Sequence, residues 1–535
     1  MARLKRDTLR STPESLVAVE RADSRILQKT NRQAGICFSF EMGENSTAVG
    51  SVTPFLRQAK WRIVILSALL IIPCLWHHHI EAGDLASHTY NAWLSELIDR
   101  GQAPGLYMVR QWNNVLFDAA LSDLGKWVGF TVGEKVGVSG CVLIFFWGVF
   151  SAASAVAQRA AWDLTPCIAM LAYGYTFHMG FMNYYLSIGL ACFILALAAR
   201  GRGVDWLVSA VLLPLALLAH PVGFLWALGT IGYVALWKKL GPKWRLLIPV
   251  AAAGCVYFIH WYLAHDAKFE ADWPEISFYK FNGADQLILF GTRYWILYWV
   301  ALAWGVICFA SEAFPRRKEK EFWKPLRLVL ELYLAAFCAT SFLPENFHVS
   351  WYAGWIGLLV SRLTTISAIL GLCAIGVLRP RKWQMAGFTA CAAIFFVFLY
   401  HDTGELDRME NQAEQLLTGL PPGTRVIGII EATEGSRLEF VHHMVDRACL
   451  GRCFSYANYE PSSGQFRIRV REGSPVVTAS NDDSDAMQGG TYVVRKEDLP
   501  LKVIFQCDDD DPTRLCLRDL REGEKTGQPG ILASQ

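Results

Sequence analysis

The chain has 535 residues, of which 53% are apolar and only 18% are charged, against roughly 25% charged residues in soluble domains. Its 50 basic and 48 acidic side chains nearly cancel, which excludes a nucleic-acid-coating protein, and the apolar content excludes a disordered or collagen-like chain. Twenty tryptophans raise the aromatic share to 13%, as is common where side chains lie at membrane interfaces. The composition predicts a polytopic α-helical membrane protein.

The first 60 residues differ in composition from the apolar middle of the chain. They are rich in Lys and Arg and contain few apolar clusters, so residues 1–60 are predicted to form a disordered, basic cytoplasmic tail. The first apolar run is too far from the N-terminus, and is followed by too many others, to be a cleaved signal peptide.

Long apolar runs fill the middle of the chain. A bilayer core about 30 Å thick requires about 20 helical residues. About eleven transmembrane helices are predicted, at Trp61–Ile80, Val136–Ala157, Leu164–Met182, Tyr184–Ala199, Trp206–Ala219, Val222–Trp237, Leu246–Ala264, Leu287–Ala310, Leu326–Leu343, Gly354–Leu378 and Trp383–Tyr400. The two runs around His220-Pro221 are short and also fit a hairpin that dips partway into the membrane.

The charges of the connecting loops predict the orientation. Alternate loops are basic, at Arg159, Arg200/Arg202, Lys238/Lys239/Lys243/Arg245, Arg316/Arg317/Lys318/Lys320 and Arg379/Arg381/Lys382. The intervening loops are poor in Lys and Arg and instead contain acids and histidines. By the positive-inside rule the N-terminus is cytoplasmic and the C-terminal segment is exoplasmic or periplasmic, in a multi-pass protein of the cytoplasmic (inner) membrane.

The C-terminal segment, residues 402–535, carries 23 acidic against 15 basic residues. An amphipathic helical pattern from Leu406 to Leu417 opens it, and short alternating runs then indicate strands of a small mixed α/β domain at Arg425–Ile430, Phe466–Val470, Val476–Ala479, Tyr492–Val494 and Val503–Phe505. The predicted organisation has three parts: the tail 1–60, a membrane domain 61–401 with a long first outer loop 81–135, and a soluble exoplasmic domain 402–535.

Four cysteines lie in the C-terminal segment: Cys449, Cys453, Cys507 and Cys516. In an oxidising compartment an even number of cysteines permits two disulfides, most simply by local pairing. Free thiols are a second interpretation. A zinc site is a third, since Cys449 and Cys453 lie close in sequence to His442 and His443.

The first outer loop is the strongest candidate for chemistry. Glu81 and Asp84 directly follow the first apolar run, and His88 lies one helical turn beyond Asp84 on the same face. A carboxylate there can act as a general base or hold a divalent metal such as Mg²⁺ or Mn²⁺. The preceding histidines, residues 77–79, favour interfacial packing over metal binding.

Other polar residues cluster at the same predicted face. The candidates for substrate binding are His178, Asn183, His220, Arg293, His348 and Arg362. A guanidinium near a membrane boundary requires a carboxylate or a phosphate, so each arginine fits either an internal ion pair or a phosphate site. Each histidine alone also fits an ordinary interfacial residue.

Together these features resemble the GT-C superfamily of membrane glycosyltransferases, such as the protein mannosyltransferase, aminoarabinose transferase and Rgt-like groups. The resemblance covers residues 60–400 and lies in the acids after the first span, the long first outer loop, the Gly180-Phe181-Met182-Asn183-Tyr184 and His220-Pro221 turns, and the outward C-terminal domain. It implies transfer of a sugar from a polyprenyl-phosphate donor to a lipid, glycan or protein acceptor at the outer face. Asp84, or Glu81, would then be the base or metal ligand, and Arg293 or Arg362 would hold the phosphate.

The chain departs from that family's adjacent acidic pair, because Glu81 and Asp84 are three residues apart. Two other functions therefore stay open: a transporter of lipid-linked substrates, and a non-catalytic membrane scaffold or sensor. The charges gather at one surface and no internal repeat is visible, which disfavours a transporter. Nucleic acid is not an expected partner.

Overall fold

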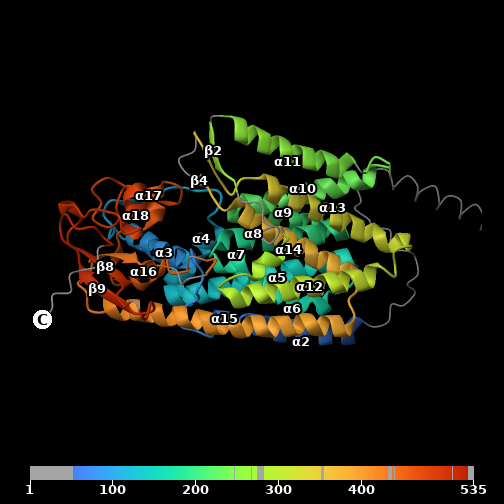
Figure 1. The fold of residues 1–535 in the computed structure, drawn as a ribbon, viewed down its shortest axis with the longest axis horizontal. Helices are drawn as coiled ribbons and strands as arrows, with labels where there is room; N and C mark the ends of the chain where they lie inside the picture. The colour runs from blue at the N-terminus through green and yellow to red at the C-terminus, as the bar shows by residue number, and fades with distance from the viewer. Residues whose placement is uncertain are drawn as a thin grey trace, which may run out of the picture.

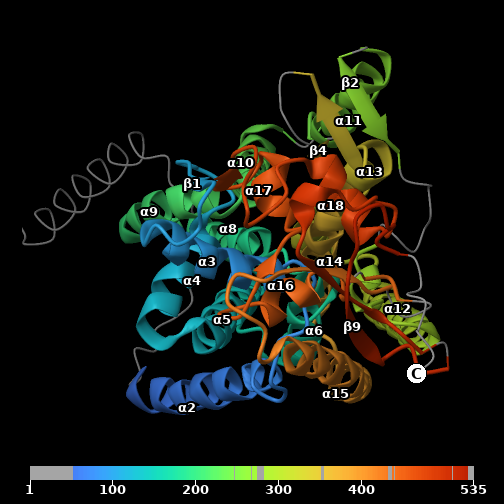
Figure 2. The same cartoon turned by 90° about the vertical axis from the view of Figure 1, so that its left-hand side faces the viewer.

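The computed structural model describes residues 52–241, 243–245, 247–266, 268–273, 282–350, 355–431, 436–438, 440–508 and 510–527. Most of these residues form a helix bundle, and a lobe of mixed structure covers one end of it (Figure 1). Figure 2 views the molecule from the lobe end, with helices α16 and α18 in front of the bundle.

Helices dominate the chain up to residue 417, and short strands and helices alternate after it. In chain order, the bundle and the first loop contain α2 (Val52–Leu70), η1 (Ile72–Cys74), α3 (Leu85–Asp99), β1 (Leu106–Met108), α4 (Leu116–Val128), α5 (Phe130–Ala157), η2 (Trp162–Leu164), α6 (Thr165–Ala172), α7 (Tyr175–His178), α8 (Met182–Arg200), α9 (Gly203–Ala219), α10 (Pro221–Lys239), α11 (Leu247–His265), β2 (Phe269–Asp272), η4 (Ala284–Leu287), α12 (Thr292–Ala313), α13 (Lys320–Phe342), β3 (Asn346–Val349), β4 (Trp355–Ile356), α14 (Leu359–Leu378) and α15 (Lys382–Leu417). The remaining chain contains β5 (Arg425–Ile429), α16 (Met444–Ala448), β6 (Phe454–Ser455), α17 (Tyr459–Ser463), β7 (Ile468–Val470), α18 (Asn481–Gln488), η5 (Lys496–Asp498), β8 (Leu501–Gln506) and β9 (Leu515–Asp519).

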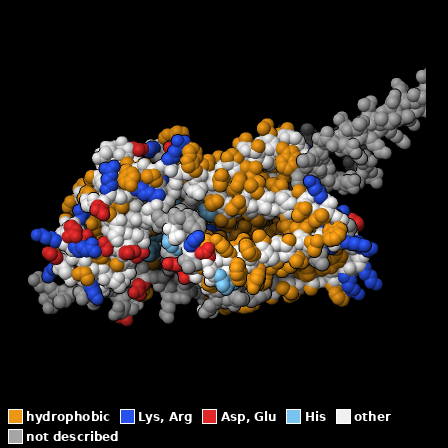
Figure 3. All heavy atoms as spheres, turned by 90° about the horizontal axis from the view of Figure 1, so that it is seen from above, with side chains coloured by type: hydrophobic (Ala, Val, Ile, Leu, Met, Phe, Trp, Pro, Cys, Tyr) orange, Lys and Arg blue, Asp and Glu red, His pale blue; other side chains and the backbone are white. Residues whose placement is uncertain are grey.

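Seven of the described helices are long and apolar enough to cross a membrane: α5, α8, α11, α12, α13, α14 and α15. Helix α9 is also apolar but has only 17 residues. Large apolar side chains such as Val250, Phe258 and Trp299 are exposed on the bundle surface. In Figure 3 such side chains cover the bundle, while Lys and Arg gather at the end remote from the lobe. This distribution is consistent with a helical membrane protein. The predicted count of eleven spans is not confirmed, since seven of the described helices have the length and hydropathy of a span.

Two predicted spans differ from the observed helices. In place of a helix over Trp61–Ile80, α2 ends at Leu70 and a 3-10 turn follows at Ile72–Cys74, because Pro73 has no N–H to continue the helix. The start of α2 at Val52 also places residues 52–60 in a helix instead of the predicted tail; residues 1–51 lie outside the described residues.

The predicted span Leu164–Met182 is likewise not one helix. Helix α6 ends at Ala172 and α7 begins at Tyr175, with Gly174 in an extended conformation between them. A Cβ at Gly174 would lie 2.9 Å from the Gln286 carbonyl oxygen, so the break allows η4 to approach the backbone.

Helix α15 connects the bundle to the lobe. It has 36 residues, so at 1.5 Å per residue it is about 54 Å long, well beyond the roughly 30 Å of a bilayer core. Its second half carries the predicted amphipathic pattern, and Leu406, Met409 and Leu417 are buried. The expected domain boundary at residue 401 therefore falls inside a continuous helix, which runs along one side of the molecule in Figure 1.

The strands form three small sheets. In the four-stranded sheet, of order β6-β5-β8-β9, β5 is parallel to β6 and β8, and β9 is antiparallel to β8. Strands β5, β7 and β8 lie within or overlap predicted strands. The prediction was wrong at Val476–Ala479, which is irregular, and at Tyr492–Val494, where Val493 forms only an isolated bridge with Lys525.

The first loop and the C-terminal segment build one lobe together. Strand β1 of the loop pairs antiparallel with β7, with Leu106 opposite Val470. The Tyr90 hydroxyl of α3 accepts a hydrogen bond from the Ser455 backbone N–H at 2.9 Å. Ten of the fifteen residues of α3 are buried, so this helix packs inside the lobe.

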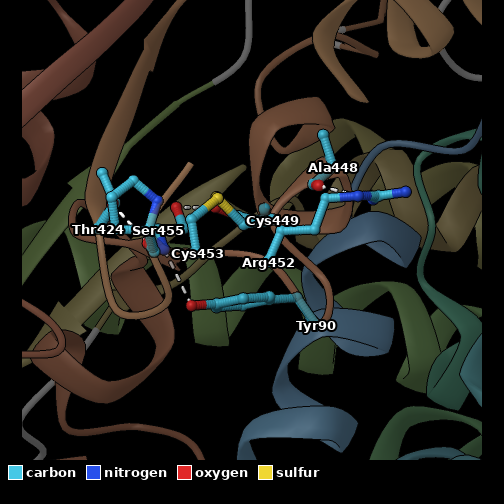
Figure 4. Close-up of a disulfide and its surroundings, with 9 residues drawn as sticks. Tyr90, Thr424, Ala448, Cys449, Arg452, Cys453 and Ser455 are labelled. Carbon is cyan, nitrogen blue, oxygen red and sulfur yellow. Dashed lines mark hydrogen bonds between the residues drawn. A yellow bond between two sulfur atoms is a disulfide. The ribbon is translucent and has the colours of Figure 1, made fainter. Parts of the chain in front are cut away.

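Both disulfides predicted by local pairing are present. Cys449 is bonded to Cys453, and Cys507 to Cys516. Figure 4 shows the Cys449–Cys453 bridge next to Tyr90, between α16 and β6. Cys449 and Cys453 are therefore not zinc ligands, which overturns that interpretation of the cysteine pair.

A buried arginine of the lobe joins the separate segments. The guanidinium of Arg447, on α16, contacts Glu410 of α15 at 2.5 Å and Glu134 of α5 at 3.0 Å, and it donates to the Ile80 carbonyl oxygen at 3.0 Å. Glu81 lies 3.7 Å away. All these side chains are buried, so the ion pairs operate at low dielectric.

We expect Arg447→Met to destabilise the protein by about 3–5 kcal/mol, because it leaves buried carboxylates without a counter-charge. Thermal unfolding of the detergent-solubilised protein measures the change. The control is Arg100→Met, which removes an exposed ion pair with Glu96 and is expected to cost at most about 1 kcal/mol. Equal stability of the Arg447 variant and the wild type would contradict this role.

Candidate active site

Two turns singled out in the sequence lie against each other at the lobe end of the bundle. The Gly83 N–H donates to the His178 carbonyl at 2.8 Å, and the Asp84 N–H donates to the Met179 carbonyl at 3.1 Å. Gly180 has a φ of +78°, and a Cβ there would lie 2.4 Å from the Asp84 nitrogen. Only glycine satisfies both the conformation and the contact, so the turn fixes the backbone of Asp84.

The Asp84 side chain faces a histidine of the lobe. Its Oδ1 lies 3.8 Å from Nε2 of His443, and its side chain is 31% exposed, whereas that of His443 is only 7% exposed. Nδ1 of His443 lies 3.0 Å from the Asp446 carboxylate, which accepts a hydrogen bond from the Ser455 hydroxyl. Burial alone would lower the pKa of His443, but Asp446, Asp84 and Glu460 together raise it above its usual value.

Arg362 of α14 is near enough to Asp84 for their charges to interact. Its guanidinium donates to the Gly357 carbonyl at 2.5 Å and lies 4.4 Å from the centre of the Phe181 ring. Its Nε is buried with no hydrogen-bond partner, and it forms no ion pair within 4.0 Å in the described part of the chain. The negative charges of Asp84 and Glu345 act on it from farther away. A guanidinium placed this way can accept an additional anionic partner.

His220 lies near the same arginine but is held by local hydrogen bonds. Its Nδ1 accepts from the Val222 N–H at 3.2 Å and caps the N-terminus of α10, and its carbonyl accepts from the Ser187 hydroxyl. Its ring contacts the edge of Tyr184, whose hydroxyl donates to the Arg362 carbonyl. His220 therefore supports the backbone around Arg362.

His88 and Asn183 meet at a buried aspartate that was not among the sequence candidates. Asp118 of α4 lies 2.7 Å from Nδ1 of His88, and its second oxygen accepts from the Asn183 amide at 2.7 Å. Burial alone would lower the pKa of His88, but the carboxylates of Asp118, Glu460 and Asp84 raise it to about 9. This network ties α3 to α4 and α8, next to Asp84.

Glu81 points to a different environment from Asp84. It lies beside Arg447, and its Oε1 is buried without a hydrogen-bond partner. Burial and the neighbouring Glu410 raise its pKa to about 8, although Arg447 opposes this. His178 lies behind it, with Nδ1 donating to the Glu81 carbonyl at 2.8 Å.

Two sequence candidates lie elsewhere in the fold. Arg293 forms an ion pair with Asp402 of α15, which also accepts from the Tyr294 hydroxyl at 2.7 Å. It therefore fits the internal ion pair and not the phosphate site. His348 lies in β3, opposite Glu270 of β2, within the sheet that β2, β3 and β4 form.

The site residues predicted from the sequence do not include the four side chains that the lobe places near Asp84 and His88. These are His443, Asp446, Tyr459 and Glu460. The ring of Tyr459 stacks on His443 at 4.9 Å, and Glu460 lies 3.7 Å from Nδ1 of His88. The i, i+3 spacing of His443 and Asp446 is a recognisable signal of a carboxylate-oriented imidazole, but nothing in the sequence indicates that it faces Asp84.

The predicted pair of metal ligands does not converge on one ion. In the described residues, three groups of histidine and acidic side chains have ligand atoms close enough to share a metal: His78, His79 and Glu414; His79, Glu81 and Asp407; and His401, Asp402 and Glu405. Glu81 belongs to one group and Asp84 to none. The neighbours of Asp84 are His443 and Arg362, a donor set that does not suit a hard cation such as Mg²⁺ or Mn²⁺.

No family model, curated protein or solved structure matches this chain.

The buried His88–Asp118 pair predicts a pH dependence of stability. Because the pKa of His88 in the folded protein, about 9, exceeds its unfolded value of about 6.5, the pair stabilises the fold fully below about pH 6.5. This contribution, about 3 kcal/mol, is lost as the pH rises through 9. Thermal unfolding of the wild type and His88→Gln between pH 6 and 10 tests it. Their difference in stability is expected to shrink at high pH, and a constant difference would contradict the pairing.

Proposed function

We propose that this protein is a membrane glycosyltransferase of the GT-C type, which transfers a sugar from a polyprenyl-phosphate donor to a hydroxyl of a lipid, glycan or protein acceptor. One observation carries the proposal: the partly exposed carboxylate of Asp84 lies 3.8 Å from a carboxylate-oriented imidazole, His443, and within electrostatic range of Arg362, a guanidinium without an ion-pair partner among the described residues. This arrangement supplies a base and a phosphate-binding group in the same region of the fold.

In the proposed reaction Asp84 accepts the proton of the acceptor hydroxyl as its oxygen bonds to the anomeric carbon of the sugar. The bond between that carbon and the phosphate oxygen breaks, and the electron pair leaves with the polyprenyl phosphate. Arg362 stabilises the negative charge that develops there. His443 is a positioning residue, since its imidazole is oriented by Asp446 and faces the Asp84 carboxylate at 3.8 Å. No step needs a metal at Asp84.

The location of Arg362 suits a donor with a lipid tail. It lies in the first turn of α14, one of the seven membrane-length helices, at the end of the bundle that the lobe covers. A phosphate bound there would lie at the membrane boundary, with its polyprenyl chain able to follow the apolar helix surface.

The cysteines support an outward-facing lobe. The four cysteines of the C-terminal segment are all in disulfides, whereas the nine described cysteines of the preceding chain are all free. Disulfides persist in oxidising compartments. Together with basic loops at the remote end of the bundle, this supports a lobe in the periplasm or other exoplasmic space and a protein of the cytoplasmic membrane.

We expect Asp84→Asn to lower transfer by about 10²–10⁴-fold, the usual contribution of a general base, with normal expression and unfolding temperature. The purified protein is assayed with a panel of polyprenyl-phosphate sugars. Asp99→Asn is the matched control, because Asp99 is an exposed acid at the end of the same helix, α3. Full activity in Asp84→Asn would remove Asp84 from the mechanism. A wild type that is inactive with every donor would favour a scaffold or transporter.

We expect Arg362→Met to raise the KM for the lipid donor roughly 10- to 100-fold, the cost of losing a hydrogen bond to a charged group, with a smaller effect on the KM for the acceptor. Arg362→Lys retains the charge but loses the planar pair of donors, so it should fall between the wild type and Arg362→Met. Steady-state kinetics with each substrate varied in turn measures the split. An effect confined to the acceptor would contradict a phosphate-binding role.

A further inference from the structure

We propose that His78, His79 and Glu414 form a Zn²⁺ site, separate from Asp84 and independent of the proposed transferase function. The three side chains come from the segment after η1 and from the lobe half of α15, and their ligand atoms all lie within 4.8 Å of one another. Two imidazoles and one carboxylate match the donor set of many zinc sites.

The distances fit a tetrahedral ion. Nε2 of His79 lies 3.3 Å from Oε1 of Glu414. Ligand atoms about 2.0–2.1 Å from zinc at tetrahedral angles lie roughly 3.4 Å apart, so these two atoms already have the required separation. The ring of His78 packs edge-on against that of His79, with 4.4 Å between ring centres, and its ligand nitrogen lies within 4.8 Å of the other two ligand atoms.

The residues behind these ligands are arranged as outer-shell partners. Nδ1 of His79 lies 3.1 Å from Oδ1 of Asp407, which also accepts from the His79 backbone N–H at 2.7 Å. A proton on Nδ1 leaves the lone pair on Nε2 directed at Glu414, as in carboxylate–histidine–zinc arrangements. The other oxygen of Glu414 lies 3.2 Å from the Arg452 guanidinium, which orients the carboxylate.

An ion can reach this position. A cavity of about 280 Å³ is lined by all three proposed ligands and by Thr131, Arg447 and Arg452, among others. His79 is buried, whereas His78 is exposed and the Glu414 side chain is 21% exposed. Three protein ligands leave the fourth position of zinc for a water molecule in the cavity.

The charge balance favours a cation here. In the described part of the chain, five carboxylates lie around His79 and the cavity, where they pair with His79 and with the guanidiniums of Arg447 and Arg452. One of the acids, Glu81, has a fully buried Oε1 with no hydrogen-bond partner, and it lies in the group of close ligand atoms that contains His79 and Asp407. A divalent ion bound to His79 would add positive charge among these closely spaced acids and offset their mutual repulsion. The imidazole ligands select zinc over Mg²⁺ or Ca²⁺, which prefer oxygen.

The test uses the full chain purified in detergent with a tag that contains no histidine. After chelator treatment, Zn²⁺ binding is measured by calorimetry and by metal analysis, and Co²⁺ serves as a spectroscopic substitute that reports a tetrahedral site. His78→Ala and Glu414→Gln alter exposed or partly exposed side chains, so they avoid the folding risk of changing buried His79. His77→Ala is the matched control, because the His77 ring instead stacks on Tyr400. Unfolding temperature in the metal-free state checks that each variant is folded.

We expect one zinc per chain in the wild type and in His77→Ala. The dissociation constant should rise 10- to 100-fold in Asp407→Asn, the usual effect of removing an outer-shell partner, and more than about 100-fold in His78→Ala and Glu414→Gln. Asp84→Asn should bind zinc like the wild type, whatever its transferase activity. The site is refuted if the wild type binds no stoichiometric zinc, if the ligand variants bind it equally well, or if Asp84→Asn abolishes binding.

Discussion

The ion pairs of one buried guanidinium determine how the rest of the molecule is assembled. Arg447 contacts Glu410 of α15 and Glu134 of α5, and it donates to the Ile80 carbonyl just before Glu81. Each pair operates at low dielectric, so the guanidinium cannot be lost without leaving its acids uncompensated. His443 lies one helical turn before Arg447 and faces Asp84, three residues beyond Glu81. The residues from His443 to Arg447 thus face both acids of the first loop, with Arg447 near Glu81 and His443 near Asp84. Because the ion pairs of Arg447 anchor this turn, they also position His443 opposite Asp84.

The charge states of the other groups in the site follow from an excess of carboxylates over guanidiniums. Where α3, α4, α15 and the lobe meet, carboxylates outnumber fixed cations, so histidines take up positive charge despite burial. His88 does so between Asp118 and Glu460, and Asp446 and Asp84 likewise raise the pKa of His443. The exception is Arg362, a cation near Asp84 that forms no ion pair within the described residues. Under the proposed function, this asymmetry separates Asp84, the general base, from Glu81, which lies among the ion pairs of Arg447.

Much of the architecture was predictable because it depends on local patterns. Apolar length located the membrane helices, short cysteine spacing predicted both disulfides, and the turn residues Glu81, Asp84 and Gly180 marked the segments that meet at the site. Helix ends set by single residues, such as Pro73 and Gly174, were missed because hydropathy averages over them. Long-range pairings such as β1 with β7, or His443 with Asp84, leave no trace in one sequence, since they depend on tertiary packing alone.

Helix α15 has a consequence for modularity. Because it continues without interruption from the bundle into the lobe, and because α3 and β1 of the first loop complete that lobe, the C-terminal segment is not a detachable unit. A fragment starting at residue 402 would begin within a helix and would lack the strand opposite β7 and the side chains that face Arg447 from α5. Because Glu410 of α15 pairs with Arg447, and His443 four residues before Arg447 faces Asp84, a tilt of α15 that follows bilayer thickness would act on the residues around Asp84.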